Sequence, residues 1–308
     1  MRETPSPQNQ RSPEQAVHAL SRRAQVFFGK GLYREAEACY LRALAAAEEV
    51  FGDDHLEVAT VLNNLGVVYK YLARFAEARR VYARSLAIIE RVLGPDQTDA
   101  ATLYHNLGGL EHAAGNHAEG EPLARKSVEI REKALGPDHP HVAADLAALG
   151  ALLEGQRNYR EAEQIYRHSL RIFEGAQGGY ETEAAVALNN LASVCLATGR
   201  ESEAEDLYLR ALGIKERVLG AMHPEVGMTL NNLGVFYKKV GQYDKAESSY
   251  QRALSVFETL GPEHPKIAAT KANYAKLLRK MGRADEASAL RAAPVVDSEV
   301  DQDQSNSK

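Results

Sequence analysis

The chain has 308 residues, of which 44% are hydrophobic, and its formal net charge is −5. Binding to nucleic acid needs a clustered surplus of Lys and Arg, so this charge argues against a nucleic-acid partner. No stretch approaches the roughly 20 apolar residues that span a bilayer, and the N-terminus lacks the apolar run of a signal peptide, so no membrane partner is expected. The two cysteines, Cys39 and Cys195, lie far apart, and we expect no disulfide framework and a reducing, cytoplasmic location.

Residues 1–12 are rich in Pro, Ser and Gln. Such a composition buries too little apolar surface to offset the entropy of ordering the chain, so it predicts a disordered N-terminal segment. Helical periodicity begins directly after it. We assign residues 13–293 to one repeat domain, with an opening unit near residues 14–50.

A four-residue motif then recurs along the chain at a fixed step. Asn63-Asn64-Leu65-Gly66 returns at residues 189–192 and 231–234, with weaker copies at 105–108 and 147–150, and the step is 42 residues. One residue is lost near Leu260, so the last copy lies at 273–275. Tyrosines keep the same step: Tyr40, Tyr82, Tyr166, Tyr208 and Tyr250. We count seven units, of which the first and last are atypical, as capping repeats usually are.

Each unit contains the pattern of two helices. Residues 135–140 form an inter-unit loop in which Gly136 ends one helix and Pro140 begins the next. Apolar residues follow at helical spacing in both helices, as in Val58, Leu62, Leu65 and Tyr69 of a first helix and Ala246, Tyr250, Ala253 and Leu254 of a second. The pattern predicts an all-α solenoid of about seven helix pairs, and helical spacing places the tyrosine series in its core.

Small residues recur at one position of the first helices: Gly66, Gly108, Gly150, Ala192, Gly234 and Ala275. Glycine inside a helix costs about 1 kcal/mol relative to alanine. Its regular return therefore indicates a packing requirement between the paired helices.

The repeat unit resembles the tetratricopeptide repeat of kinesin light chains. Residues 219–254 carry Leu-Gly-x-x-His-Pro-x-Val, Leu-Asn-Asn-Leu-Gly and Tyr-x-Arg-Ala-Leu at that family's spacing, and the resemblance covers about residues 14–291. It implies a right-handed superhelical solenoid in which the first helices line a concave wall that binds peptides. Kinesin light chains carry a long heptad segment before their repeats, which joins the motor heavy chain, whereas only about 13 residues precede the repeats here. We therefore carry over the repeat fold and the peptide-binding groove alone.

Helical geometry identifies the residues of this expected wall. At about 100° per residue, Thr60, Asn64, Val67 and Tyr71 point away from the apolar face, with Asn63 and Lys70 beside them. The asparagines recur as a ladder: Asn106, Asn189, Asn190, Asn231, Asn232 and Asn273. Asn is a mediocre helix former whose amide suits an extended peptide backbone, so the ladder predicts ligand contact. The alternative is that these amides bond to neighbouring helices or face water.

The ladder is not uniform. It breaks at Ala144, Ala147, Ala148 and Ala151, and towards the C-terminus the wall becomes basic, with Lys238, Lys239, Lys276, Arg279 and Lys280. These cations would attract an acidic segment of a partner. The alternative is a solvated face of a capping helix.

Other candidate chemistry is weak. His55, His139, His223 and His264 precede first helices, where we expect a role in helix starts, and residues 138–141 offer too few and too linear ligands for zinc. Glu161 and Glu163 begin a second helix, where the dipole favours acidic groups. We find no phosphate loop, nucleophile elbow or Cys-His pairing, so we expect no catalytic residue, metal or cofactor.

The leading interpretation is a protein-interaction scaffold or adaptor, not an enzyme, that binds an extended peptide or partner segment in the groove. The alternative is a regulatory sensor whose solenoid responds to a short peptide. RNA binding is disfavoured by the charge and by the absence of regular aromatic stacking positions. The pattern leaves the oligomeric state open. Residues 294–308, which begin with Pro294 and are thereby separated from the last helix, are acidic, which predicts a disordered acidic tail.

Overall fold

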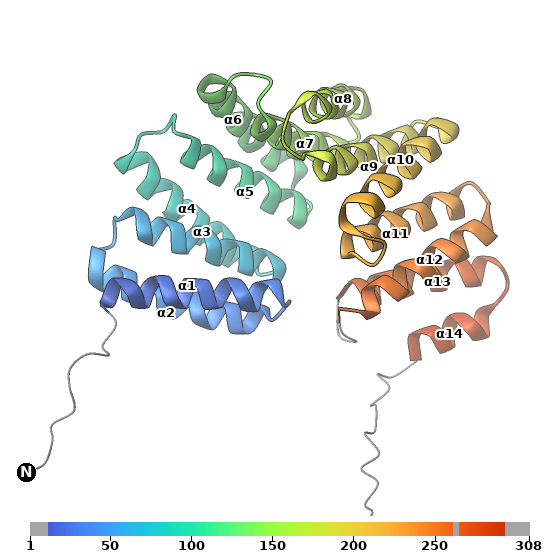
Figure 1. The fold of residues 1–308 in the computed structure, drawn as a ribbon, viewed down its shortest axis with the longest axis horizontal. Helices are drawn as coiled ribbons and strands as arrows, with labels where there is room; N and C mark the ends of the chain where they lie inside the picture. The colour runs from blue at the N-terminus through green and yellow to red at the C-terminus, as the bar shows by residue number, and fades with distance from the viewer. Residues whose placement is uncertain (1–11, 261–264, 293–308) are drawn as a thin grey trace, which may run out of the picture. The chain divides into compact units, whose positions relative to one another are not determined.

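The structure, a computed structural model, describes residues 12–260 and 265–292, and within these ranges the chain forms fourteen helices and no strand (Figure 1). The expected all-α architecture of about seven helix pairs is confirmed. The predicted acidic tail, the segment before Ser12 and His264 lie outside the described residues. Ser12 itself caps the first helix, since its side chain accepts the backbone N–H of Gln15.

The helices alternate between first and second members of a pair. The first helices are α1 (Pro13–Gly29), α3 (Leu56–Tyr71), α5 (Thr98–Ala114), α7 (Pro140–Gly155), α9 (Glu181–Ala197), α11 (Pro224–Lys239) and α13 (Pro265–Lys280). The second helices are α2 (Tyr33–Phe51), α4 (Phe75–Val92), α6 (His117–Leu135), α8 (Tyr159–Gly175), α10 (Glu201–Leu219), α12 (Tyr243–Glu258) and α14 (Ala284–Ala292).

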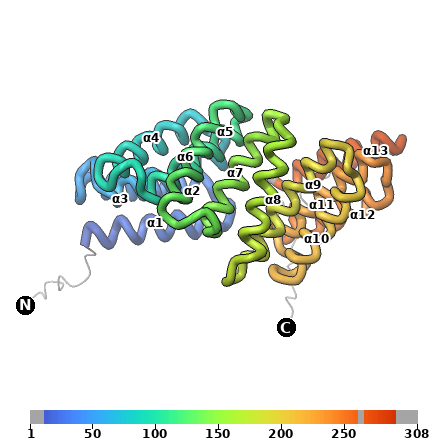
Figure 2. Tube along the Cα trace, turned by 90° about the horizontal axis from the view of Figure 1, so that it is seen from above, coloured from blue at the N-terminus to red at the C-terminus, as the bar shows by residue number. Residues whose placement is uncertain are grey.

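The chain divides into two compact units, residues 1–194 and 195–308, with the boundary inside α9. Within the first unit each helix packs on the next, from α1 to α8, and α5 also contacts α3 and α7. Within the second unit α11 contacts α13 directly, and α12 packs on both (Figures 1 and 2). In each unit the first helices therefore form a layer of their own.

The loop residues explain where helices begin and end. His55, His139 and His223 are N-caps: each Nδ1 accepts the backbone N–H of the residue two positions on, at 3.1, 3.1 and 3.3 Å. The expected role of these histidines at helix starts is confirmed, and the side-chain cap supplies its mechanism. Gly136, at φ 88°, ends α6 in a conformation that an L side chain rarely adopts.

The recurring glycines have a packing role. Gly66, Gly150 and Gly234 each lie beneath the ring of a tyrosine from the second helix of the same pair: Tyr82, Tyr166 and Tyr250. A Cβ at these glycines would lie 2.5–2.6 Å from the nearest ring atom, well inside van der Waals contact. All three tyrosines are fully buried, so the predicted core role of the tyrosines and the predicted packing requirement are both confirmed.

Buried serines add a second repeated link between neighbouring helices. Ser85, Ser127 and Ser169 each donate a hydrogen bond to the carbonyl oxygen of an alanine 26 residues earlier, at 2.7, 2.9 and 2.7 Å. The acceptors, Ala59, Ala101 and Ala143, lie in the first helix of the same pair. Each bond joins a second helix to its own first helix and satisfies a hydroxyl that has no access to water.

Candidate functional site

The wall formed by α3, α5 and α7 presents a graded surface. Thr60 and Tyr71 are exposed, Tyr71 at 56% of its side-chain surface, whereas Asn64, Val67 and Lys70 are half-buried. The core face of α3 is buried throughout, including Val58, Leu62, Leu65 and Tyr69. The helix therefore has the two faces that its sequence periodicity predicts.

Part of the asparagine ladder bonds to itself. Asn106 Nδ2 donates to Asn63 Oδ1 at 2.8 Å in the first unit, and Asn273 Nδ2 donates to Asn231 Oδ1 at 3.2 Å in the second. Adjacent first helices are thus linked by amide pairs, which is the role that the sequence left open as an alternative. Each pair still has unused amide hydrogens and an unused carbonyl oxygen, so the two roles are compatible.

The remaining asparagines differ in what they offer. Asn64, Asn190 and Asn232 make no hydrogen bond within the described part of the chain, and Asn232 is exposed. Asn189 is only 7% exposed, so its side chain offers little surface to a ligand. Their contact with a peptide stays a prediction.

A buried ionic cluster occupies the wall where the ladder breaks. Asp145 of α7 is 2% exposed, and its Oδ1 lies 2.7 Å from His105 Nδ1 of α5. Its Oδ2 lies 2.7 Å from Arg131 Nε of α6, at an angle outside hydrogen-bond geometry. Arg131 also donates to Thr102 Oγ1 at 2.9 Å. The His105 side chain, which is 35% exposed, is therefore oriented by the Asp145 carboxylate, which Arg131 also contacts.

Sequence reasoning missed this cluster, although the repeat contains a signal for it. Asp145 stands 84 residues after Val61 and 42 after Leu103, both of which are apolar, and Arg131 stands 42 residues after Ile89. Charged residues at core positions of a repeat indicate a buried ion pair. Whether Asp145 and Arg131 come into contact depends on how neighbouring helix pairs pack, which the sequence does not show.

The inner wall of the second unit carries a cluster of cations. Burial lowers the pKa of Lys238, and the charges of Lys276 and Lys280 lower it further. Lys276, Arg279 and Lys280 are exposed on α13, and Lys280 lies over the ring of Tyr243 at 5.4 Å. Lys239 Nζ donates to the carbonyl oxygen of Leu196 at 3.1 Å, so it is tied to backbone.

The cations of the second helices are placed differently. In the second unit Lys245, Arg252 and Arg283 all pair with carboxylates of neighbouring helices, namely Glu205, Glu216 and Glu247. Lys238, Lys276 and Lys280 form no ion pair within the described residues. The charges of Lys245, Arg252 and Arg283 are therefore neutralised by carboxylates, whereas within the described residues those of the three wall lysines are not.

A smaller basic group lies on the wall of the first unit. Burial lowers the pKa of Lys70. Burial also lowers the pKa of His112, and His117 and Lys70 add to that effect. The rings of His112 and His117 are 5.1 Å apart, and Gly109 leaves room for the Lys70 ammonium. His112 and His117 were not among the residues predicted from the sequence.

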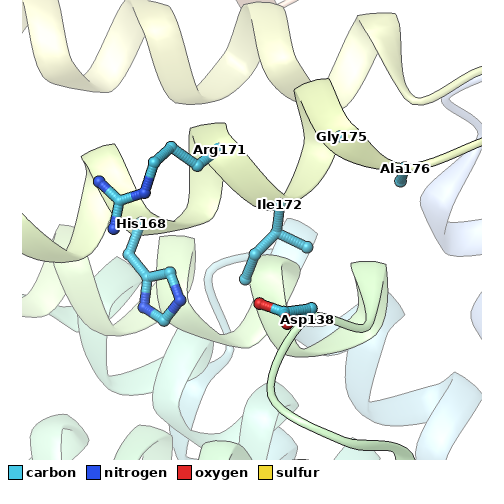
Figure 3. Close-up of a pocket in the computed structure, with 6 residues that line it drawn as sticks. All are labelled: Asp138, His168, Arg171, Ile172, Gly175 and Ala176. Atoms are coloured by element: carbon cyan, nitrogen blue, oxygen red, sulfur yellow. The ribbon is translucent and has the colours of Figure 1, made fainter.

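A cavity of about 400 Å³ lies away from this wall, beside the loop before α7. Figure 3 shows His168 and Arg171 extending to the same side of α8, with Ile172 pointing towards Asp138. The repeat explains the opening. Asp54 and Asp96, at the equivalent loop position, bind Arg91 and Lys133, but the residue equivalent to these cations is Gly175, so the space beside Asp138 is left unfilled.

Among the residues that the structure describes, no group of three or more His, Cys, Asp or Glu side chains is arranged to hold a metal ion. In the same residues no helix is long and apolar enough to cross a membrane. Cys39 and Cys195 are both buried thiols.

A family model for the tetratricopeptide repeat matches residues 15–91, 67–119, 99–175, 146–217, 183–257 and 225–290, which together span nearly all of the helical region. The chain belongs to the tetratricopeptide repeat family. The resemblance that the 42-residue motif indicated is thereby confirmed. None of the curated proteins compared with this tetratricopeptide chain matches it.

Solved structures share the tetratricopeptide fold at low sequence identity. Nearly identical repeats of a Podosopora anserina protein classed with kinesin light chains are 20% identical, cover 67% of this chain and 97% of their own, and have a TM-score of 0.54. The quorum sensor NprR from B. thuringiensis, in its apo form, is 14% identical, with 91% of this chain and 75% of its own covered and a TM-score of 0.68. A Rap protein in complex with Competence and Sporulation Factor is 15% identical, with the same coverage and a TM-score of 0.67.

Proposed function

We propose that this tetratricopeptide protein is an adaptor that binds an extended, acidic segment of a partner protein on the wall formed by its first helices. The observation that carries the proposal is the positive charge of Lys238, Lys276 and Lys280, which form no ion pair in the part of the chain that the structure describes, although the net charge of the chain is −5. Clustered cations without partners raise the local concentration of an acidic ligand and increase its association rate.

The asparagines of the same wall supply contacts that do not depend on sequence. An extended peptide has unpaired backbone N–H and C=O groups, and side-chain amides can satisfy both kinds. Asn232 is exposed on α11, the helix that also carries Lys238, so an amide and a cation are offered by one helix. The amides would bind the peptide backbone, and the lysines would favour peptides with acidic side chains.

The structural relatives support a peptide ligand without identifying it. One of them is a Rap protein in complex with Competence and Sporulation Factor, and another is a quorum sensor. At 14–15% identity these relatives share only the fold with this chain. They are the reason to keep a second candidate function, a peptide-responsive sensor, beside the adaptor. Small-angle scattering distinguishes the two, because a sensor changes its radius of gyration when the peptide binds.

The charge of the wall is tested with two pools of fluorescent 12-residue peptides that differ only in having Glu or Lys at four fixed positions. We expect the Glu pool to bind more tightly. The double variant Lys238→Gln/Lys276→Gln should weaken that binding at least tenfold, about 1.4 kcal/mol.

The matched control is Lys245→Gln/Arg252→Gln, which removes the same charge from α12 and leaves the wall intact. It should bind the Glu pool as the parent does. Equal binding of both pools by the parent protein, or equal losses in the two double variants, would contradict an acidic ligand on this wall.

A further inference from the structure

The cavity beside Asp138 differs from the equivalent place in the two preceding helix pairs. It encloses about 400 Å³, within the range of roughly 300–1,000 Å³ that small-molecule sites usually have. The loop before α7 and the last two turns of α8 line it. A ligand bound there would therefore leave the wall of the first helices free.

One ion pair of the repeat is missing at this cavity. In each of the two preceding helix pairs, the last turn of the second helix supplies a cation to the loop aspartate. These ion pairs are Arg91–Asp54 at 2.6 Å and Lys133–Asp96 at 3.3 Å. Gly175 replaces the cation in the next pair, and the Asp138 side chain forms no hydrogen bond or ion pair within the described residues. The repeat itself thus shows that a cation fits beside this aspartate.

The end of α8 strengthens the preference for a cation. The helix ends at Gly175, whereas α6 continues to Leu135, the position equivalent to Gln177. The C-terminal end of a helix carries partial negative charge from its unpaired carbonyl groups. Asp138 and the end of α8 therefore both favour a positively charged group at this side of the cavity.

A second ion pair of the repeat is also missing. In α6, Lys126 Nζ lies 3.2 Å from Glu129 Oε2, and the residues 42 positions on are His168 and Arg171 of α8. A guanidinium group thus replaces the carboxylate. Neither side chain forms a hydrogen bond or an ion pair within the residues that the structure describes. This side of the cavity therefore offers donors to an anion.

Both sides open on the same cavity. Figure 3 shows Ile172 pointing towards Asp138, with the ends of Arg171 and His168 together to one side. Asp138 and Arg171 are exposed, so a solute can reach both, and Ile172 supplies a buried apolar surface at 6% exposure. A ligand with one cation, one anion and an apolar part between them matches all three.

We propose that this cavity binds a small zwitterion in which an ammonium or guanidinium group and a carboxylate are separated by a short methylene chain, as in ω-amino acids. The cation contacts Asp138, the carboxylate contacts Arg171 and His168, and the chain lies over Ile172. One molecule thus supplies both ionic partners that the repeat lacks here. This site is additional to the peptide-binding wall and does not depend on it.

The test measures binding to the full chain by isothermal titration calorimetry. The zwitterions are 4-aminobutanoate, 5-aminopentanoate, 6-aminohexanoate and 4-guanidinobutanoate, and the single-charge controls are pentanoate and pentylamine. We expect the best zwitterion to bind at least tenfold more tightly than either control, because each control loses one of the two ionic contacts. A control that binds as tightly as the best zwitterion, or no binding of any zwitterion, overturns the proposal.

Three variants locate the site. Gly175→Lys restores the missing cation within the chain, and nothing lies within 4 Å of the Cβ that it adds. Its ammonium should pair with Asp138 and lower the zwitterion affinity at least tenfold, as should Asp138→Asn. Gly213→Lys is the matched control, since it adds the same charge at an exposed glycine of α10 whose Cβ is equally unobstructed. It should bind the zwitterion as the parent does.

The outcomes separate this inference from the proposed function. Affinity that survives in both Gly175→Lys and Asp138→Asn overturns the assignment to this cavity, and an equal loss in Gly213→Lys reduces the effect to net charge and overturns it as well. Melting temperatures show that the variants are folded. Binding of the Glu peptide pool should be the same in all three variants, so the zwitterion site can fail while peptide binding on the wall stands.

Discussion

The ring of Tyr166 in α8 lies so close to Gly150 in α7 that a methyl group at Gly150 would be 2.5 Å from Tyr166 Cε1. Tyr166 is fully buried, and its hydroxyl donates to Glu154 Oε2 at 3.1 Å, so the ring is fixed at both ends. The same approach recurs between Gly66 and Tyr82 and between Gly234 and Tyr250. The paired helices can therefore approach this closely only because glycine has no side chain at the point of contact.

Gly150→Ala should destabilise the protein by about 1–3 kcal/mol, because overpacking forces the Tyr166 ring or the helix backbone to move. Gly213→Ala is the matched control: Gly213 lies in α10, is exposed, and has nothing within 4 Å of its missing Cβ. That change should stabilise α10 by up to about 1 kcal/mol. Denaturant unfolding compares the two; a stabilised Gly150→Ala would refute the close packing.

Asp145→Leu should destabilise the region around α5–α7 by about 3–5 kcal/mol, because it leaves the Arg131 guanidinium buried without its carboxylate. Arg131→Met on the same background should recover most of the loss, since an apolar pair replaces the ion pair. Native-state hydrogen exchange measures both locally, which suits a repeat array that unfolds in parts. No recovery in the double variant would mean that the carboxylate serves His105 more than Arg131.

The stability of the first unit should depend on pH through His112. Burial and neighbouring cations lower its folded pKa, so below the unfolded value of about 6.5 the unfolded state binds more protons at this site. Stability should therefore fall as pH falls from about 6.5 through the folded pKa, and His112→Asn should remove that part of the loss. Melting temperatures between pH 5 and 8 check this. Lys70→Met should reduce the loss of stability at low pH, since Lys70 contributes to the lowered pKa of His112. If both variants keep the parent's dependence of melting temperature on pH, His112 is not its source.

Asn190→Ala/Asn232→Ala should leave the melting temperature nearly unchanged, because neither side chain makes a hydrogen bond within the described residues and alanine is the better helix former. Binding of a partner peptide should fall at least tenfold, about 1.4 kcal/mol. Asn106→Ala is the contrasting variant: it removes the bond to Asn63 and should lower stability. The ladder is structural instead if the double variant melts early and binds normally.

The repeat made most of the fold predictable. A 42-residue step with apolar residues at helical spacing specifies the helix pairs, the buried tyrosines and the helix starts at His139 and His223, because these depend on contacts within one repeat. The amide pair Asn63–Asn106 and the cluster around Asp145 join different repeats. Their partners follow from the packing between pairs, which periodicity alone does not give.

The candidate site was predictable in outline only. The basic residues Lys238, Lys276 and Lys280 were visible as a sequence cluster, and the structure adds that they lack ion-pair partners within the described residues. The contact of Lys239 with the Leu196 carbonyl was not visible, because it depends on how α9 and α11 pack.

The tyrosine–glycine contact has a consequence for protein engineering. Gly150 and Tyr166 belong to one helix pair, so a block of 42 residues that is duplicated, deleted or moved to another array carries both members of the contact with it. The ionic cluster is not contained in one such block, because His105 and Arg131 belong to one helix pair and Asp145 to the next. Recombination between these two helix pairs would separate Asp145 from His105 and Arg131 and leave buried charges without their partners. Exchange of α11–α12 as one block would keep the contact between Gly234 and Tyr250.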